Sequence, residues 1–207
     1  MKLAGCLLLA LAPLAVVSQS MGQFHRAEQD REIRYWLLDP ATHQFFISHD
    51  FTVTRTGQKS VHSFVRKGSE VSPDAKIFNL DTGEPLKTHT VSGKEVNALG
   101  YYPQAQDPES IAVQGDLTEA VAEGRSVRVR VEETYTDPVG YTMKGSELEW
   151  TRTLGRPVNF VSLPAGWILT SVNTPAVITL DSQGRVTLRF TNTRNGDLAV
   201  TIRARRK

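Results

Sequence analysis

The chain has 207 residues, of which 40% are hydrophobic, and its 24 lysines and arginines nearly balance 22 aspartates and glutamates. This is enough chain for one or two cores of ordinary size, and a formal net charge of +2 gives no global electrostatic reason to expect nucleic acid as a partner. The sole cysteine, Cys6, lies near the N-terminus, so the rest of the chain has no disulfides, nucleophilic thiols or thiolate metal sites.

Residues 1–20 have the layout of a secretory signal peptide. Lys2 precedes an apolar run over 7–17, and small polar residues follow at 18–20, in the order found in signal peptides. The apolar run is shorter than the roughly 20 residues that cross a bilayer as a helix. We therefore expect removal of 1–20, no transmembrane segment in the mature chain, and an exported protein, periplasmic or secreted. The lack of Asn-x-Ser/Thr sequons favours a bacterial one.

After a polar lead over 21–32, apolar and polar residues alternate with period two. In 127–131 every second residue is valine and the others are arginine, the pattern of a strand with one face buried and the other in water. Turn signals separate such runs, which recur at 51–54, 61–64, 186–190 and 198–202. These closely spaced strand signals, without a long amphipathic helix, predict an all-β fold, an antiparallel β-sandwich.

The strongest local prediction is a hairpin near the C-terminus. The runs 186–190 and 198–202 flank Asn195-Gly196, a dipeptide that favours the positive φ values of tight hairpin turns. We expect these two runs to pair as antiparallel neighbours.

Helices have little support in the sequence. The only stretch with helical character is 116–122, and it is short. Ser92-Gly93-Lys94 resembles the end of a phosphate-binding loop, but Thr88 occupies the position of the required first glycine and no helical pattern follows. We therefore expect neither a phosphate loop nor a helix after Lys94.

The loop 101–110, which contains Pro103 and Pro108, divides the strand-rich chain. We expect two immunoglobulin-like or saddle-like halves, an N-terminal β-sandwich domain at 21–117 and a C-terminal one at 118–207. A single large sandwich spanning 33–207 is the alternative.

The first half resembles a known family in the rhythm of its segments. A strand-rich lead from Tyr35 is followed by Phe64-Val65-Arg66, by Asp-Thr-Gly-Glu-Pro-Leu at 81–86 and by Gly-Arg-Ser-Val-Arg-Val at 124–129. In this it is similar to the non-catalytic β-rich N-terminal domain of gluzincin-type zinc aminopeptidases, whose zinc signature His-Glu-x-x-His is absent from the sequence. The resemblance implies a saddle-like sheet without zinc chemistry. The second half, with Trp150 and residues 159–167, resembles an immunoglobulin-like module.

No pattern in the sequence predicts catalysis, a metal site or a cofactor. The Gly-x-Ser-x-Gly phrase of serine hydrolases is missing. Glu132 and Glu133 are neighbours, and neighbouring side chains of a strand point to opposite faces, so they cannot act together as a catalytic pair. None of the short spacings of metal ligands occurs among the histidines, which we interpret as scattered side chains: His25, His43, His49, His62 and His89. A site formed by His49-Asp50 and His62 on neighbouring predicted strands is the alternative.

Aromatic residues supply the one candidate binding site. Tyr101 and Tyr102 stand at the lip of the proline-containing loop, where exposed rings bind partners by stacking. Partial packing beneath the loop is the alternative. Trp36, Trp150 and Trp167 lie in or beside apolar runs and are expected in the core.

These features favour a non-catalytic binding or assembly module that recognises a protein or glycan of the cell envelope through loop aromatics or an exposed strand edge. A small hydrolase or carbohydrate-active enzyme is the first alternative, and it requires a concave polar pocket whose titratable groups have shifted pKa values. A purely structural accessory domain, the second alternative, requires neither a partner nor a pocket.

Overall fold

The computed structural model describes residues 32–193 and 196–207. Within this part of the chain the fold is mostly β, with one short α-helix, as the all-β prediction states. The predicted signal peptide lies outside the described residues. No helix in the described part is long and apolar enough to cross a membrane.

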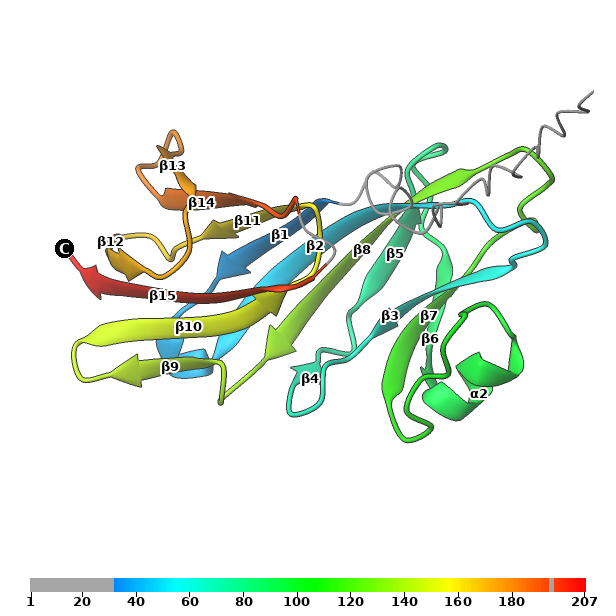
Figure 1. Cartoon of the computed structure of the whole chain (residues 1–207), viewed down its shortest axis with the longest axis horizontal. Helices are drawn as coiled ribbons and strands as arrows, with labels where there is room; N and C mark the ends of the chain where they lie inside the picture. The colour runs from blue at the N-terminus through cyan, green and yellow to red at the C-terminus, as the bar shows by residue number, and fades with distance from the viewer. Residues whose placement is uncertain (1–31, 194–195) are drawn as a thin grey trace, which may run out of the picture.

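The largest sheet has eight strands in the order β13-β14-β11-β1-β2-β8-β4, with β5 also paired to β8 (Figure 1). Its strands are β1 (Glu32–Leu37), β2 (Gln44–Val53), β4 (Glu70–Val71), β5 (Lys76–Asn79), β8 (Val127–Thr136), β11 (Val158–Ser162), β13 (Val177–Leu180) and β14 (Val186–Thr191). The described neighbours in this sheet pair antiparallel, except that β1 and β11 are parallel. The sheet is therefore antiparallel apart from this central pair.

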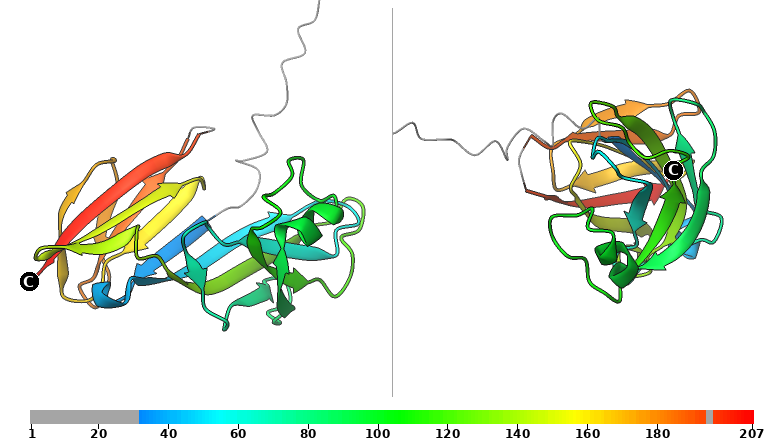
Figure 2. Two further views of the ribbon diagram at one scale, coloured as in Figure 1. Left: turned by 90° about the horizontal axis from the view of Figure 1, so that it is seen from below. Right: turned by 90° about the vertical axis from the view of Figure 1, so that its right-hand side faces the viewer.

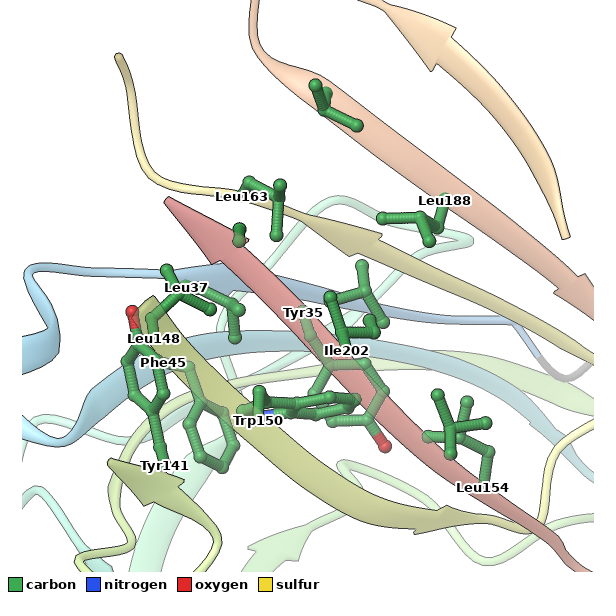
Figure 3. Close-up of a cluster of buried hydrophobic side chains, with 14 of the residues drawn as sticks. Tyr35, Leu37, Phe45, Tyr141, Leu148, Trp150, Leu154, Leu163, Leu188 and Ile202 are labelled. Carbon is green, nitrogen blue, oxygen red and sulfur yellow. The ribbon is translucent and has the colours of Figure 1, made fainter. Parts of the chain in front are cut away.

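A four-stranded sheet packs on one end of the first. Its strands, in the order β12-β15-β10-β9, are β9 (Tyr141–Lys144), β10 (Glu147–Leu154), β12 (Trp167–Val172) and β15 (Leu198–Arg206). Fully buried Trp150 of β10 meets Tyr35 of β1 and Phe45 of β2, with ring centroids 5.3 and 6.0 Å apart, so the inner faces of the two sheets share one core (Figure 3). This pair of sheets is a sandwich in the ordinary sense.

A three-stranded sheet and the helix lie at the opposite end of the molecule (Figure 2). The sheet has the order β3-β7-β6, from β3 (Ser60–Phe64), β7 (Ile111–Asp116) and β6 (Lys87–Ser92), and the helix is α2 (Gly93–Ala98). Val61 and Val113 from this sheet pack in a second core with Ile77, Val129 and Val131 of the large sheet. The chain thus builds two main cores on one continuous sheet.

The predicted domain boundary at 117/118 falls between β7 and β8. Hydrogen bonds of the large sheet cross that boundary, because β2 pairs with β8 from Gln44 opposite Thr136 to Val53 opposite Val127. Both the division into two domains and the single large sandwich stay predictions.

The predicted C-terminal hairpin is wrong. β14 pairs with β11 and β13, whereas β15 pairs with β10 and β12 in the other sheet. The alternation in each run shows only that one face of the strand is buried. Here Leu188 and Phe190 enter the core from one sheet, and Val200 and Ile202 enter the same core from the other. Asn195 lies outside the described residues.

The helix lies elsewhere than the local sequence pattern indicates. The stretch 116–122 is not helical, because Asp116 ends β7 and 117–122 form a loop, whereas α2 begins immediately after Ser92. The Ser92 hydroxyl accepts a hydrogen bond from the Glu95 amide at 3.3 Å, and the Glu95 carboxylate accepts one from the Ser92 amide at 2.7 Å. This capping box supports a helix that the apolar periodicity does not reveal.

A single methyl group added at Gly93, the first residue of α2, is expected to disturb the loop 101–110, which we call the tyrosine loop. A Cβ at this position would overlap the backbone oxygen of Asp107 in that loop. We expect Gly93→Ala to lower the free energy of unfolding by about 1–3 kcal/mol, the usual effect of overpacking, as measured by urea denaturation. Gly196→Ala is the matched control, because its added Cβ meets no described atom within 4 Å, and an equal loss in both variants would contradict the steric explanation.

Candidate functional site

A cavity of about 500 Å³ is lined by side chains of β1, β2, β3, β8 and β10 and by the loops that follow β3, α2, β10 and β14. Its volume lies within the range of small-molecule sites, roughly 300–1,000 Å³. We call it the arginine pocket after Arg66, Arg152 and Arg156, which contribute to its wall. Its acidic members are Glu133 and Asp197.

Glu133 is the buried acid of the arginine pocket. It follows Val129 and Val131 on the inward face of β8, and only 4% of it is exposed. Its Oε1 accepts a hydrogen bond from the Ser63 hydroxyl at 2.9 Å, whereas its Oε2 is buried without a hydrogen-bond partner among the described residues. Such an orphaned acceptor is costly in a native structure and calls for a donor.

Burial raises the pKa of Glu133 from 4.5 to about 7. The hydrogen bond from Ser63, the positive charge of Arg152 and the neighbouring Tyr135 hydroxyl lower the pKa, but their effect is smaller than that of desolvation. At neutral pH the carboxyl group is therefore close to half protonated. It can accept a hydrogen bond from a ligand in one state and donate one in the other.

Arg152 is held by an aromatic box. Only 7% of this residue is exposed, and its guanidinium lies 5.5, 4.9 and 5.4 Å from the ring centroids of Tyr35, Phe45 and Tyr135. One of its nitrogens is 3.4 Å from a carboxylate oxygen of Asp137. Ring faces and carboxylate together stabilise a charge that burial alone would make unfavourable.

Arg66 and Arg156 bring two further guanidinium groups to the pocket. Arg66 donates to the backbone oxygen of Thr153 at 3.0 Å, and burial, followed by the charge of Arg152, lowers its pKa. Arg156 donates from Nε to Nε2 of His49 at 3.0 Å. The three guanidinium groups of the lining face two carboxyl groups, Asp197 and the half-protonated Glu133, and Asp137 neutralises Arg152 from outside it. The net positive charge of the lining at neutral pH is therefore small.

Of the two tyrosines predicted as a binding site, Tyr102 lines the pocket and Tyr101 does not. The Tyr102 hydroxyl is 3.3 Å from Nδ1 of His62, and the Tyr102 ring meets Phe64 edge-on at 5.6 Å. Tyr101 instead packs beside it, where its hydroxyl accepts from the Lys59 amide at 3.1 Å. The structure thus places one of the pair in a pocket, and ligand binding by either stays a prediction.

His62 connects the tyrosine loop to β7. Burial lowers its pKa, so the ring is neutral at neutral pH. Its Nε2 donates to the Gln114 side-chain oxygen at 2.9 Å, which leaves Nδ1 to accept from the Tyr102 hydroxyl. The other histidine of the wall, His49, comes from β2.

Sequence reasoning missed the arginines and Glu133 as site residues. Glu132 and Glu133 do point to opposite faces of β8 as predicted, with Glu133 buried and Glu132 half-buried. The available signal was the position of Glu133, which continues the apolar face of Val129 and Val131. A charge at such a position is either paired or functional.

Among the described residues, no group of three or more histidine, cysteine or acidic side chains could hold a metal ion. The residues present therefore do not fit the zinc centre of the family that the first half resembles.

A strand edge is also exposed. β13 is the outermost strand of the large sheet, and more than half of the surface of Val177, Ile178 and Leu180 is accessible. This matches the kind of edge through which sandwich proteins pair with partners, and such pairing stays a prediction for this chain.

Comparison with known proteins finds likeness in structure alone. No family model matches the chain, and no curated protein matches it. A crystal structure of an M1 zinc metallopeptidase from Deinococcus radiodurans is similar with a TM-score of 0.46 and 14% identity, over 84% of this chain and 41% of that one. A mutant of the M1 enzyme from that organism with a bound Tyr-Ser-Ala peptide gives a TM-score of 0.47 over the same shares.

An aminopeptidase N family protein from Idiomarina loihiensis is similar with a TM-score of 0.45 and 8% identity, over 84% of this chain and 29% of that one. The similarity to zinc aminopeptidases expected from the sequence is thus found in the fold, and it extends beyond the first half. The chain spans less than half of the length of these structures. Likeness at this level bears on neither the site nor the function.

Proposed function

We propose that the chain is an exported, non-catalytic binding module, periplasmic or secreted, whose ligand occupies the arginine pocket. The observation that carries the proposal is the orphaned Oε2 of Glu133, buried in the wall of a cavity of about 500 Å³. The layout of residues 1–20 supports export.

The pocket is held in place before a ligand arrives. Thr153 orients Arg66, His49 contacts Arg156, and three rings with Asp137 position Arg152. Side chains fixed in this way lose little conformational freedom on binding, which favours affinity. Fixed guanidinium groups bind carboxylate and phosphate oxygens with charge-assisted hydrogen bonds.

The proposal is tested by thermal unfolding of the mature chain with phosphate, sulfate, citrate or glucuronate added in turn. A ligand that binds only the folded state stabilises it by about 3 kcal/mol at a hundredfold excess over its Kd. We expect at least one of these anions to raise the Tm of the wild type and to lose most of this effect in Arg66→Met.

The matched control is Arg203→Met, which removes an exposed arginine on β15 that pairs with Glu149 outside the pocket. It should respond to the anion as the wild type does. If no anion shifts the wild type more than it shifts Arg66→Met, the arginine pocket is not a binding site and the structural accessory role gains support.

An enzymatic role is the second candidate, and the raised pKa of Glu133 favours it, because a general acid works best with a pKa near the working pH. Glycoside hydrolysis needs a second carboxyl group, and the other acid of the pocket wall is the exposed Asp197. Chromatography of the bound compound after long incubation separates the two roles. Product formation that Glu133→Gln abolishes would replace binding with turnover.

A further inference from the structure

We propose that the ligand of the arginine pocket is an acidic sugar, a pyranose unit that carries a carboxylate, free or within a glycan. This inference rests on the proposed function, since it names the ligand class of the same site. Three features of the wall carry it: the excess of guanidinium groups, the unpartnered acceptor of Glu133, and the half-buried aromatic rings beside them.

The guanidinium groups require a ligand with negative charge. Burial and, after it, the positive charge of Arg152 lower the pKa of Arg66, so the charge of this guanidinium is incompletely compensated in the wall. A carboxylate beside Arg66 supplies this compensation and accepts hydrogen bonds from its guanidinium group. A neutral ligand supplies no negative charge.

The acceptor of Glu133 requires a donor without positive charge. An ammonium group would satisfy Oε2, but it would enter a wall that already holds Arg66, Arg152 and Arg156, where like charges repel strongly at low dielectric. A hydroxyl group donates to Oε2 with no such penalty. A ligand that combines a carboxylate with hydroxyl groups therefore fits better than a zwitterion such as an amino acid or a peptide end.

The aromatic rings require an apolar surface on the ligand. Phe51, Phe64 and Tyr102 are half-buried and line the cavity, so a small inorganic anion would leave their faces in water. The C–H face of a pyranose covers such rings and gains from the removal of apolar area. Uronic acids combine all three features: a carboxylate, hydroxyl groups that donate hydrogen bonds, and an apolar C–H face.

The experiment is titration calorimetry of the mature chain with oligogalacturonate, alginate and hyaluronan fragments, each compared with its methyl ester. We expect at least one oligouronate to bind and its uncharged ester to bind at least tenfold more weakly. Arg66→Met should weaken binding to a similar extent. Alanyl-tyrosine, a zwitterionic dipeptide, is titrated in the same way and represents the alternative ligand class.

Two substitutions of Glu133 test the hydrogen bond itself. Glu133→Leu removes the acceptor and should weaken oligouronate binding by about tenfold, whereas Glu133→Gln keeps an acceptor oxygen and should restore most of the affinity. Circular dichroism before each titration confirms that both variants are folded. Equal affinity in the wild type and in Glu133→Leu would overturn the inference.

The remaining outcomes separate the inference from the function on which it rests. If phosphate, sulfate or citrate protects the wild type through Arg66 while no oligouronate binds, the acidic-sugar assignment fails and the binding pocket stands. If alanyl-tyrosine binds more tightly than every oligouronate, the acidic-sugar assignment likewise fails and the binding pocket stands. If no anion of either series binds in an Arg66-dependent way, both proposals fail.

Discussion

The free energy of unfolding of Glu133→Gln, taken relative to that of the wild type, is expected to be higher at pH 8 than at pH 5. In the folded chain burial raises the pKa of Glu133 from 4.5 to about 7, so between these values the folded state keeps a proton that the unfolded state has released. Wild-type stability therefore falls as the pH rises through this window and levels off above it. A shift of this size corresponds to about 3 kcal/mol, and Glu133→Gln has no such dependence.

The measurement is the free energy of unfolding in urea at pH 5, 6, 7 and 8, taken as the difference between variant and wild type so that other titrating groups cancel. Glu132→Gln is the matched control, because Glu132 occupies the next position of β8 on its opposite face and should show no comparable change. A difference between Glu133→Gln and the wild type that stays constant from pH 5 to pH 8 would show that Glu133 titrates normally. The burial argument would then be wrong.

The faces of the strands could be predicted from the sequence, but their neighbours could not. Alternation in 127–131 correctly places Val129 and Val131 on the buried face of β8, because period-two hydrophobicity is a property of one strand alone. Strand pairing depends on which strand edges the connecting loops bring together. The runs 186–190 and 198–202 bury similar apolar faces whether they lie side by side or, as here, in opposite sheets of a sandwich.

Short local signals were present but weak. Ser92 and Glu95 form a capping box that the sequence displays as Ser-x-x-Glu, yet a helix of six residues has too few turns to show an apolar stripe. Conversely, 116–122 has helix-forming residues, but Val121 is drawn into the second core and its amide bonds to the Gln58 carbonyl. Tertiary contacts there decide the backbone conformation over local propensity.

The arginine pocket could not be assembled from the sequence, because its members are far apart along the chain. Arg66, Glu133 and Arg156 come from a loop, a strand and another loop, and the large sheet with its two covering sheets brings them together. Sites of this kind leave no local motif. Tyr102 could be predicted only because an aromatic residue beside a proline in a loop stands out in the sequence.

Trp150→Ala is expected to lower the free energy of unfolding by about 3–5 kcal/mol, the usual effect of removing a fully buried tryptophan. Trp36→Ala is the matched control: this half-buried ring contacts Phe46 at 5.5 Å on β1 and β2, and its loss should cost less than half as much. Urea denaturation of both variants gives the comparison. Equal losses would contradict the assignment of Trp150 as the link between the two sheets.

The same substitution tests whether the core supports the pocket. Trp150 packs against Tyr35 and Phe45, and those two rings also hold the guanidinium of Arg152, so a cavity at Trp150 should loosen Arg152 as well as the sandwich. The indole N–H of Trp150 has no hydrogen-bond partner among the described residues. Trp150→Phe removes this unpaired donor while keeping a ring, and it should therefore retain most of the stability and hold Arg152 in place. If Trp150→Ala were to keep the wild-type affinity for a pocket ligand at a temperature where it remains folded, the aromatic box would be independent of the core beneath it.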